Sequence, residues 1–141
     1  MTKHEILNEA LLDRAHAHAA EFLRSVVDRH VGARASRDEL MAALRVPLSD
    51  RGESADVVVD ALASQAERGA LASAGPRYFG FVIGGTLPVA LATDWLISTW
   101  DQNPGIYATS PLSSVLEDIA REWLLDVLDL PRESGVGFVT G

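Results

Sequence analysis

The 141-residue sequence contains no cysteine and a single lysine, Lys3. Without cysteine the chain has neither a disulfide framework nor a thiolate that could act as a nucleophile or hold a metal ion. A basic patch is also missing: the net charge is −8 and the pI is about 4.8, so binding to nucleic acid is not expected. The first residues are charged throughout and lack the pattern of a signal peptide. We therefore expect a cytoplasmic protein.

Long hydrophobic runs are equally scarce. The longest uncharged stretch lies between Arg77 and Asp94, and Gly84, Gly85 and Pro88 interrupt it. It falls short of a membrane span, so no membrane association is expected. The composition is otherwise that of an ordinary globular protein, with 48% hydrophobic and 23% charged residues.

The histidines, which are the remaining common metal ligands, do not form a metal-binding pattern. All four lie in the first 30 positions. His16 and His18 are two residues apart on an expected helix and so point to different sides, whereas metal ligands must share a face. We expect no metal site and interpret the histidines as surface or helix-end residues: His4, His16, His18 and His30.

Hydrophobic spacing predicts a mainly α fold with about five helices. Thr2–Glu5 and Ser36–Glu39 match the capping-box pattern, which satisfies backbone donors at a helix start. Pro88 and Pro111 suit the first position of a helix, and Ser110 suits the preceding cap. The expected helices cover approximately residues 2–30, 36–46, 54–68, 88–102 and 110–130.

Two short segments are predicted to be extended. Phe79, Phe81 and Ile83 alternate with smaller residues, which favours an extended piece over 79–83. Residues 136–139 have the composition of a strand. The Thr140-Gly141 step after it is typical of a strand-to-helix turn, where α/β folds bind phosphate.

Five pieces of the chain, taken in order, resemble the start of the group II pyridoxal-phosphate-dependent amino-acid decarboxylases. This is the aromatic-amino-acid and glutamate decarboxylase family, which belongs to fold-type I. The order and spacing of these pieces match the family over roughly Pro76–Gly141. Over residues 7–75 the match is weaker and rests on the layout of the expected helices. The pieces are PRYFGFVIGGTLPVALATDWL, WDQN, YATSPLSSVLE, EWLLDVLDLP and GVGFVTG.

The resemblance implies three segments in a homodimeric enzyme that acts on an amino acid. Residues 1–75 correspond to an N-terminal helical flap used for dimerisation. Residues 76–131 correspond to a substrate-wall and interface segment with two helices. Residues 132–141 correspond to the truncated start of the large domain that binds pyridoxal phosphate. The sequence does not identify the amino-acid substrate.

The resemblance also implies site residues, none of them catalytic. The aromatic segment resembles the wall beside the substrate side chain, and the loop after residue 102 resembles the piece that reaches into the partner subunit's active site. From the residues alone, a place in the core is favoured for the aromatics of the first group, and the resemblance makes a substrate wall an equal alternative. The implied positions are Tyr78, Phe79 and Phe81, then Asn103, Gly105 and Tyr107 for the substrate, and Thr140 and Gly141 for the cofactor.

Cofactor chemistry limits what this chain can do alone. A Schiff base with pyridoxal phosphate needs a lysine amine in a desolvated pocket, and Lys3 lies in the first turn of an exposed terminus. We expect no covalently bound cofactor and no activity in isolation. The first hypothesis is therefore an N-terminal fragment of a pyridoxal-phosphate-dependent carboxy-lyase. The alternatives are a non-catalytic helical interaction module and a small helical domain with an incidental resemblance.

Overall fold

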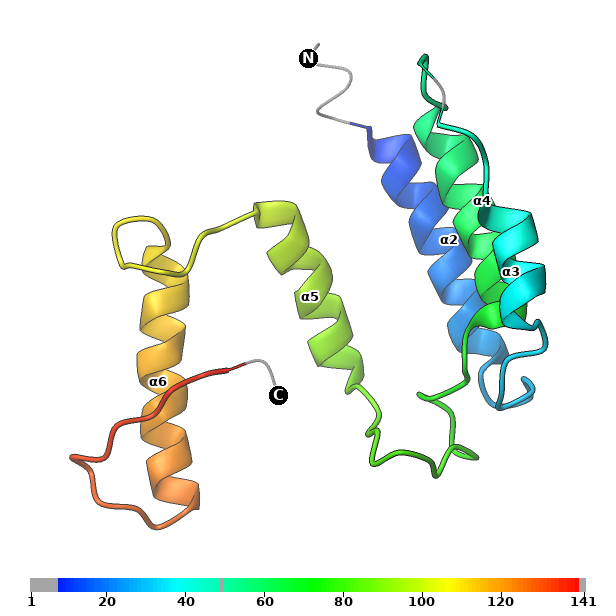
Figure 1. The fold of residues 1–141 in the computed structure, drawn as a ribbon. Helices are drawn as coiled ribbons and strands as arrows, with labels where there is room; N and C mark the ends of the chain where they lie inside the picture. Colours follow the sequence, from blue (N-terminus) through cyan, green and yellow to red (C-terminus); the bar gives the residue numbers. More distant parts are fainter. Residues whose placement is uncertain (1–7, 49, 140–141) are drawn as a thin grey trace. The chain divides into compact units, whose positions relative to one another are not determined.

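The computed structural model describes residues 8–48 and 50–139, and every regular element in these ranges is an α-helix (Figure 1). The predicted mainly α fold is therefore confirmed. The chain divides into two compact units, Met1–Thr86 and Leu87–Gly141. The boundary falls inside the expected 76–131 segment, between the aromatic residues and the helix that follows them. None of the helices in the described ranges is long and apolar enough to cross a bilayer.

The first described helix, α2, spans Glu9–Ser25. The Asn8 side chain accepts a hydrogen bond from the Leu11 amide at 3.1 Å and so caps its first turn. The predicted capping box at Thr2–Glu5 lies outside the described residues. The helix ends earlier than predicted, because the Ser25 hydroxyl donates back to the Phe22 carbonyl and the chain then turns through Arg29.

Helices α3 (Arg37–Leu44) and α4 (Ala55–Gly69) complete the first unit. The predicted capping box of α3 is confirmed: the Ser36 hydroxyl accepts from the Glu39 amide, and the Glu39 carboxylate accepts from the Ser36 amide at 2.7 Å. The Ser36 hydroxyl also donates to the Glu39 carboxylate, at 2.9 Å. The bonds from the Ser36 amide and hydroxyl stabilise the charged carboxylate and hold the pKa of Glu39 below its ordinary value.

Helix α4 is the centre of the first unit, because both α2 and α3 pack against it (Figure 1). Helices α2 and α4 run in the same direction. Arg14 contacts Asp60 near their first turns, and Arg29 contacts Glu67 at their ends. The α3–α4 contact is close at Gly69, where a Cβ would lie 3.0 Å from a methyl group of Leu40.

The second unit contains α5 (Pro88–Trp100) and α6 (Pro111–Val127), each with proline at its first position as predicted. Asp101, with φ at 48°, ends α5 in the left-handed conformation. Ser110 occupies the predicted cap position of α6, but its hydroxyl donates to the Ser113 hydroxyl at 2.7 Å and makes no capping bond to the backbone.

Both predictions of extended structure are wrong. Phe81 and Val82 have φ of 56° and 57°, and the Ile83 amide donates to the Gly80 carbonyl at 3.3 Å, so the segment turns. Residues 136–139 have no regular structure. A strand is held by hydrogen bonds to a neighbouring strand. The described residues contain no strand that could pair with residues 136–139.

Very little of the described chain is buried. The buried apolar residues in it are Ala35, Ala72 and Leu125. Many large hydrophobic side chains stay exposed on α2, α4, α5 and α6, far more than the scattered exposed residues of a typical soluble domain. These helix faces are therefore free to pack against other surfaces.

Candidate functional site

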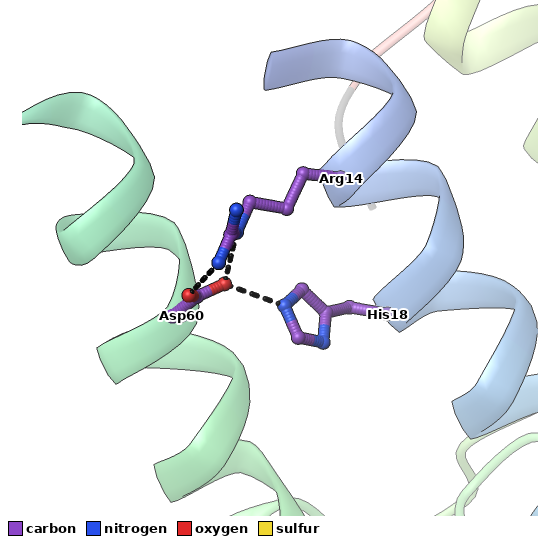
Figure 2. A network of polar contacts seen from close by, with 3 residues as sticks. All are labelled: Arg14, His18 and Asp60. Atoms are coloured by element: carbon purple, nitrogen blue, oxygen red, sulfur yellow. Dashed lines mark hydrogen bonds and ion pairs between the residues drawn. The ribbon is translucent and has the colours of Figure 1, made fainter. Parts of the chain in front are cut away.

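A cluster of three charged or polar side chains joins α2 to α4 (Figure 2). Arg14 and His18 are four residues apart on α2, so they lie on the same face of that helix. Asp60 reaches them from α4. The Asp60 carboxylate accepts two hydrogen bonds from the Arg14 guanidinium and one from His18 Nε2, the last at 2.9 Å. The arrangement fixes the register of the two helices.

The cluster changes the electrostatics of its members. The hydrogen bonds from Arg14 and then His18 hold the pKa of Asp60 well below its usual range. The same contact raises the pKa of Arg14. Asp60 is therefore an ionised acceptor whose partners are already in place, which suits a structural contact better than proton transfer.

Next to the cluster, a groove of about 500 Å³ runs between α2 and α4. Its floor consists mostly of small and apolar residues, and His18 and Asp60 lie along it. The volume falls within the range of small-ligand pockets, roughly 300–1,000 Å³. The apolar residues that line it are Ala15, Ala19, Phe22, Val59, Leu62, Ala63 and Ala66.

At the other end of the same helix pair, Arg29 forms a second link. Its side chain is only 8% exposed and forms an ion pair with Glu67 at 2.8 Å. It also donates to the Ser25 hydroxyl, and its guanidinium lies 4.4 Å from the centre of the Phe22 ring. Arg77 in turn donates to the Arg29 carbonyl. This link therefore holds the start of the aromatic segment against the end of α2.

The aromatic segment predicted to line a substrate pocket is largely on the surface of the first unit. Phe79 and Phe81 are 92% and 89% exposed. Tyr78 is half-buried, and its hydroxyl is buried with no hydrogen-bond partner in the described residues. Leaving the buried Tyr78 hydroxyl without a hydrogen bond costs free energy of folding. The exposed rings of Phe79 and Phe81 are not part of a core. The core interpretation of Phe79 and Phe81 is therefore wrong for this unit.

The turn that carries these rings has an uncommon backbone. Two consecutive residues, Phe81 and Val82, lie in the left-handed region. This conformation is rare for residues other than glycine and rarest for a β-branched residue such as Val82. Strain of this kind is found at functional sites more often than elsewhere.

The other predicted substrate residues lie in the loop between α5 and α6 in the second unit. The Asn103 side chain accepts from the Gly105 amide at 3.0 Å, and the Thr109 hydroxyl donates to the Asn103 carbonyl at 2.8 Å. These bonds give the loop a defined shape, with Tyr107 64% exposed on it. This group and the aromatic group belong to different units, and each is positioned by its own local contacts.

The predicted cofactor residues Thr140 and Gly141 lie outside the described residues, so their role stays a prediction. Within 8–48 and 50–139, no group of three histidine, aspartate or glutamate side chains is placed to hold a metal ion. Lys3, the sole lysine, also lies outside the described residues, so the absence of covalently bound pyridoxal phosphate stays a prediction.

Comparisons of this chain with protein-family models, with curated proteins and with solved structures give no match. Function must therefore be argued from the residues themselves.

Sequence reasoning missed the cluster of Arg14, His18 and Asp60. One signal was present, because Arg14 and His18 are spaced to share a helix face. The His16–His18 spacing, by contrast, bears on metal binding alone. The acidic partner comes from a helix 42 residues away from His18. No local pattern predicts that α2 and α4 run side by side in this register.

Proposed function

We propose that this chain is the N-terminal helical segment of a cytoplasmic pyridoxal-phosphate-dependent amino-acid decarboxylase. In that enzyme it supplies contacts between the subunits of a homodimer and part of the substrate-pocket wall. The ordered motifs between Pro76 and Gly141 support the family. The observation that carries the role is the exposure of apolar side chains on four of the helices, since such faces need a covering surface.

In this proposal Phe79 and Phe81, exposed on a strained turn, form the wall beside the substrate. The loop with Tyr107, which Asn103 closes, reaches into the partner subunit's active site. Exposed aromatics held by a fixed backbone can contact an apolar side chain of a substrate at little entropic cost. In this proposal the groups that bind and activate the cofactor come from the large domain of the full-length enzyme, and this chain adds no proton-transfer group.

The decisive experiment uses the full reading frame that contains this chain. The purified protein is incubated with pyridoxal phosphate and with aromatic and acidic amino acids, and CO₂ release is measured. We expect release with one of these classes, and we expect Phe81→Ala to raise KM roughly tenfold through loss of an aromatic contact. Leu48→Ala, at an exposed position in another loop, is the matched control. No CO₂ release and no cofactor absorbance from the full reading frame would overturn the proposal.

A second candidate function is a non-catalytic helical interaction module. The same exposed faces favour it, and it requires no cofactor. The two candidates differ in one measurement: an interaction module shows no cofactor absorbance even when the full reading frame is expressed.

A further inference from the structure

Helix α6 presents two parallel rows of exposed side chains. One row is apolar and the other acidic, and the members of each row are four residues apart, so they line up along the helix. No packing contact with α5 covers them in the described residues. The apolar row is Val115, Ile119, Trp123 and Val127, and the acidic row is Asp118, Glu122 and Asp126.

The side of α6 opposite the apolar row is already occupied by its own chain. Leu125, which is 2% exposed, lies two residues after Trp123 and therefore about 160° around the helix from it. On that side Arg121 donates to the carbonyls of Arg132 at 3.0 Å and of Ser134 at 3.4 Å. The chain after α6 thus lies against the Leu125 side, and the apolar row faces away from it. The acidic row lies between the two, because Asp118 and Glu122 come seven and three residues before Leu125.

Two of the three residues of the acidic row lack a cationic partner within their own unit. Residues 87–141 contain two arginines against eight acidic residues, and no lysine or histidine. Arg121 is held by backbone carbonyls, and Arg132 forms an ion pair with Asp126. In the part of the unit that the structure describes, Asp118 and Glu122 are left without a cationic partner.

We propose that this face of α6 binds a partner helix with an apolar row flanked by a row of lysine or arginine at the same spacing. The apolar rows pack into a helix–helix seam, and the charged rows pair along its edge. Complementary charges of this kind select the partner and its orientation. This inference goes beyond the decarboxylase proposal and does not depend on it, because it needs only α6.

A second copy of α6 fits this face less well than a basic helix. In an antiparallel pair the two acidic rows lie opposite each other, and like charges destabilise such a seam. In a parallel pair each acidic row lies beside Ala120 and Leu124 of the other copy and gains no cation. Either arrangement buries the apolar row while leaving Asp118 and Glu122 unpaired.

The test titrates two synthetic amphipathic peptides into the purified chain and follows binding by fluorescence anisotropy. Both peptides carry the same leucine row, flanked by lysine in one and by glutamate in the other. We expect the lysine peptide to bind roughly tenfold more tightly than the glutamate peptide. Its lysines form two or three charge pairs with the acidic row of α6, whereas the glutamates of the other peptide repel the same residues. The difference should shrink as salt is added. Equal affinities that do not change with salt would overturn the proposal without any variant.

Charge reversal then localises the site. The double substitution Asp118→Lys with Glu122→Lys should reverse the preference toward the glutamate peptide. The control, Asp38→Lys with Glu53→Lys, makes the same change in net charge in the first unit and should leave the preference unchanged. An equal shift in the control would mean non-specific attraction. If sedimentation shows instead that Trp123→Asp abolishes self-association of the chain, the occupant of this face is a second copy and the proposal fails.

Discussion

Asp60 is the single residue on which the α2–α4 register depends most. It accepts from both Arg14 and His18, and no other side chain in the described part of the unit makes three such bonds across the helix pair. Because the contact lowers the pKa of Asp60 in the folded chain, its contribution to stability has a defined pH dependence. The contribution is complete above the ordinary value of 3.8 and is lost as the pH falls below 3.8 toward the lowered pKa.

We predict that Asp60→Asn lowers the urea midpoint of unfolding at neutral pH and that the difference from the unmodified chain shrinks at about pH 3. The amide keeps the shape of the side chain but removes the charge that Arg14 and His18 stabilise. Far-UV circular dichroism during urea titration measures both midpoints. Asp13→Asn, at an exposed aspartate of α2, is the control and should change neither. Identical midpoints for Asp60→Asn and the unmodified chain at neutral pH would show that the cluster is not stabilising.

The two serine caps of the first unit offer a matched comparison. Ser36 makes a complete capping box with Glu39, whereas Ser54 occupies the cap position of α4 without a capping bond to the backbone. We predict that Ser36→Ala lowers the free energy of unfolding by about 1 kcal/mol. Ser54→Ala should cost clearly less. Urea titrations of both variants give the values, and a larger loss for Ser54→Ala would contradict this assignment of the caps.

At the scale of elements, the helices could be predicted from the sequence because their signals are local. The capping box at Ser36, the prolines at the first positions of α5 and α6, and the apolar spacing all act within one or two turns. The predicted strand at 136–139 failed because a strand depends on a neighbour that local sequence does not show. The turn at Phe81–Val82 could not be predicted either, since both residues prefer extended backbone.

In the candidate site, too, some residues could be predicted from local sequence and others depend on distant contacts. The exposed rings of Phe79 and Tyr107 were named from motifs, and the structure gives their loops and exposure without testing what they bind. The cluster around Asp60 and the link through Arg29 depend on contacts between residues about 40 positions apart. Such contacts arise from helix packing, so sequence spacing alone did not predict them.

Arg29 ties α2 to α4 as a pair of elements, and its removal should loosen that pair. Arg29→Met retains much of the volume over Phe22 but loses the ion pair with Glu67 and the hydrogen bond to Ser25. We predict a loss of about 2 kcal/mol in the free energy of unfolding, typical of hydrogen bonds to a charged group.

The control for this variant is Arg37→Met. Arg37 is 83% exposed, and its contact with Asp38 is long at 3.7 Å. Arg37→Met should therefore change the free energy of unfolding by no more than about 0.5 kcal/mol. Urea denaturation followed by circular dichroism measures both. If the two variants lose the same amount, Arg29 is not an inter-helix link.

At the scale of the whole molecule, the main feature is apolar surface that neither unit covers by itself. Helix α5 is apolar around most of its circumference, and in the described residues it packs against no other helix. Trp95, Leu96, Ile97 and Trp100 are all between two-fifths and three-fifths exposed. Burial of such surface is worth roughly 25 cal/mol per Å², which makes association favourable even for a modest patch.

We therefore predict that the isolated chain self-associates at about micromolar concentration, through apolar faces that include α5. A charge placed in the contact must be desolvated, so Trp100→Asp should weaken association by at least roughly tenfold. Ser98→Asp is the control, because it places the same charge at an exposed polar position two residues earlier on the same helix, and it should weaken association less. Sedimentation velocity at several concentrations measures all three proteins. A concentration-independent monomer for the unmodified chain would mean that these faces pack against each other within the chain, and the need for an outside covering surface would then disappear.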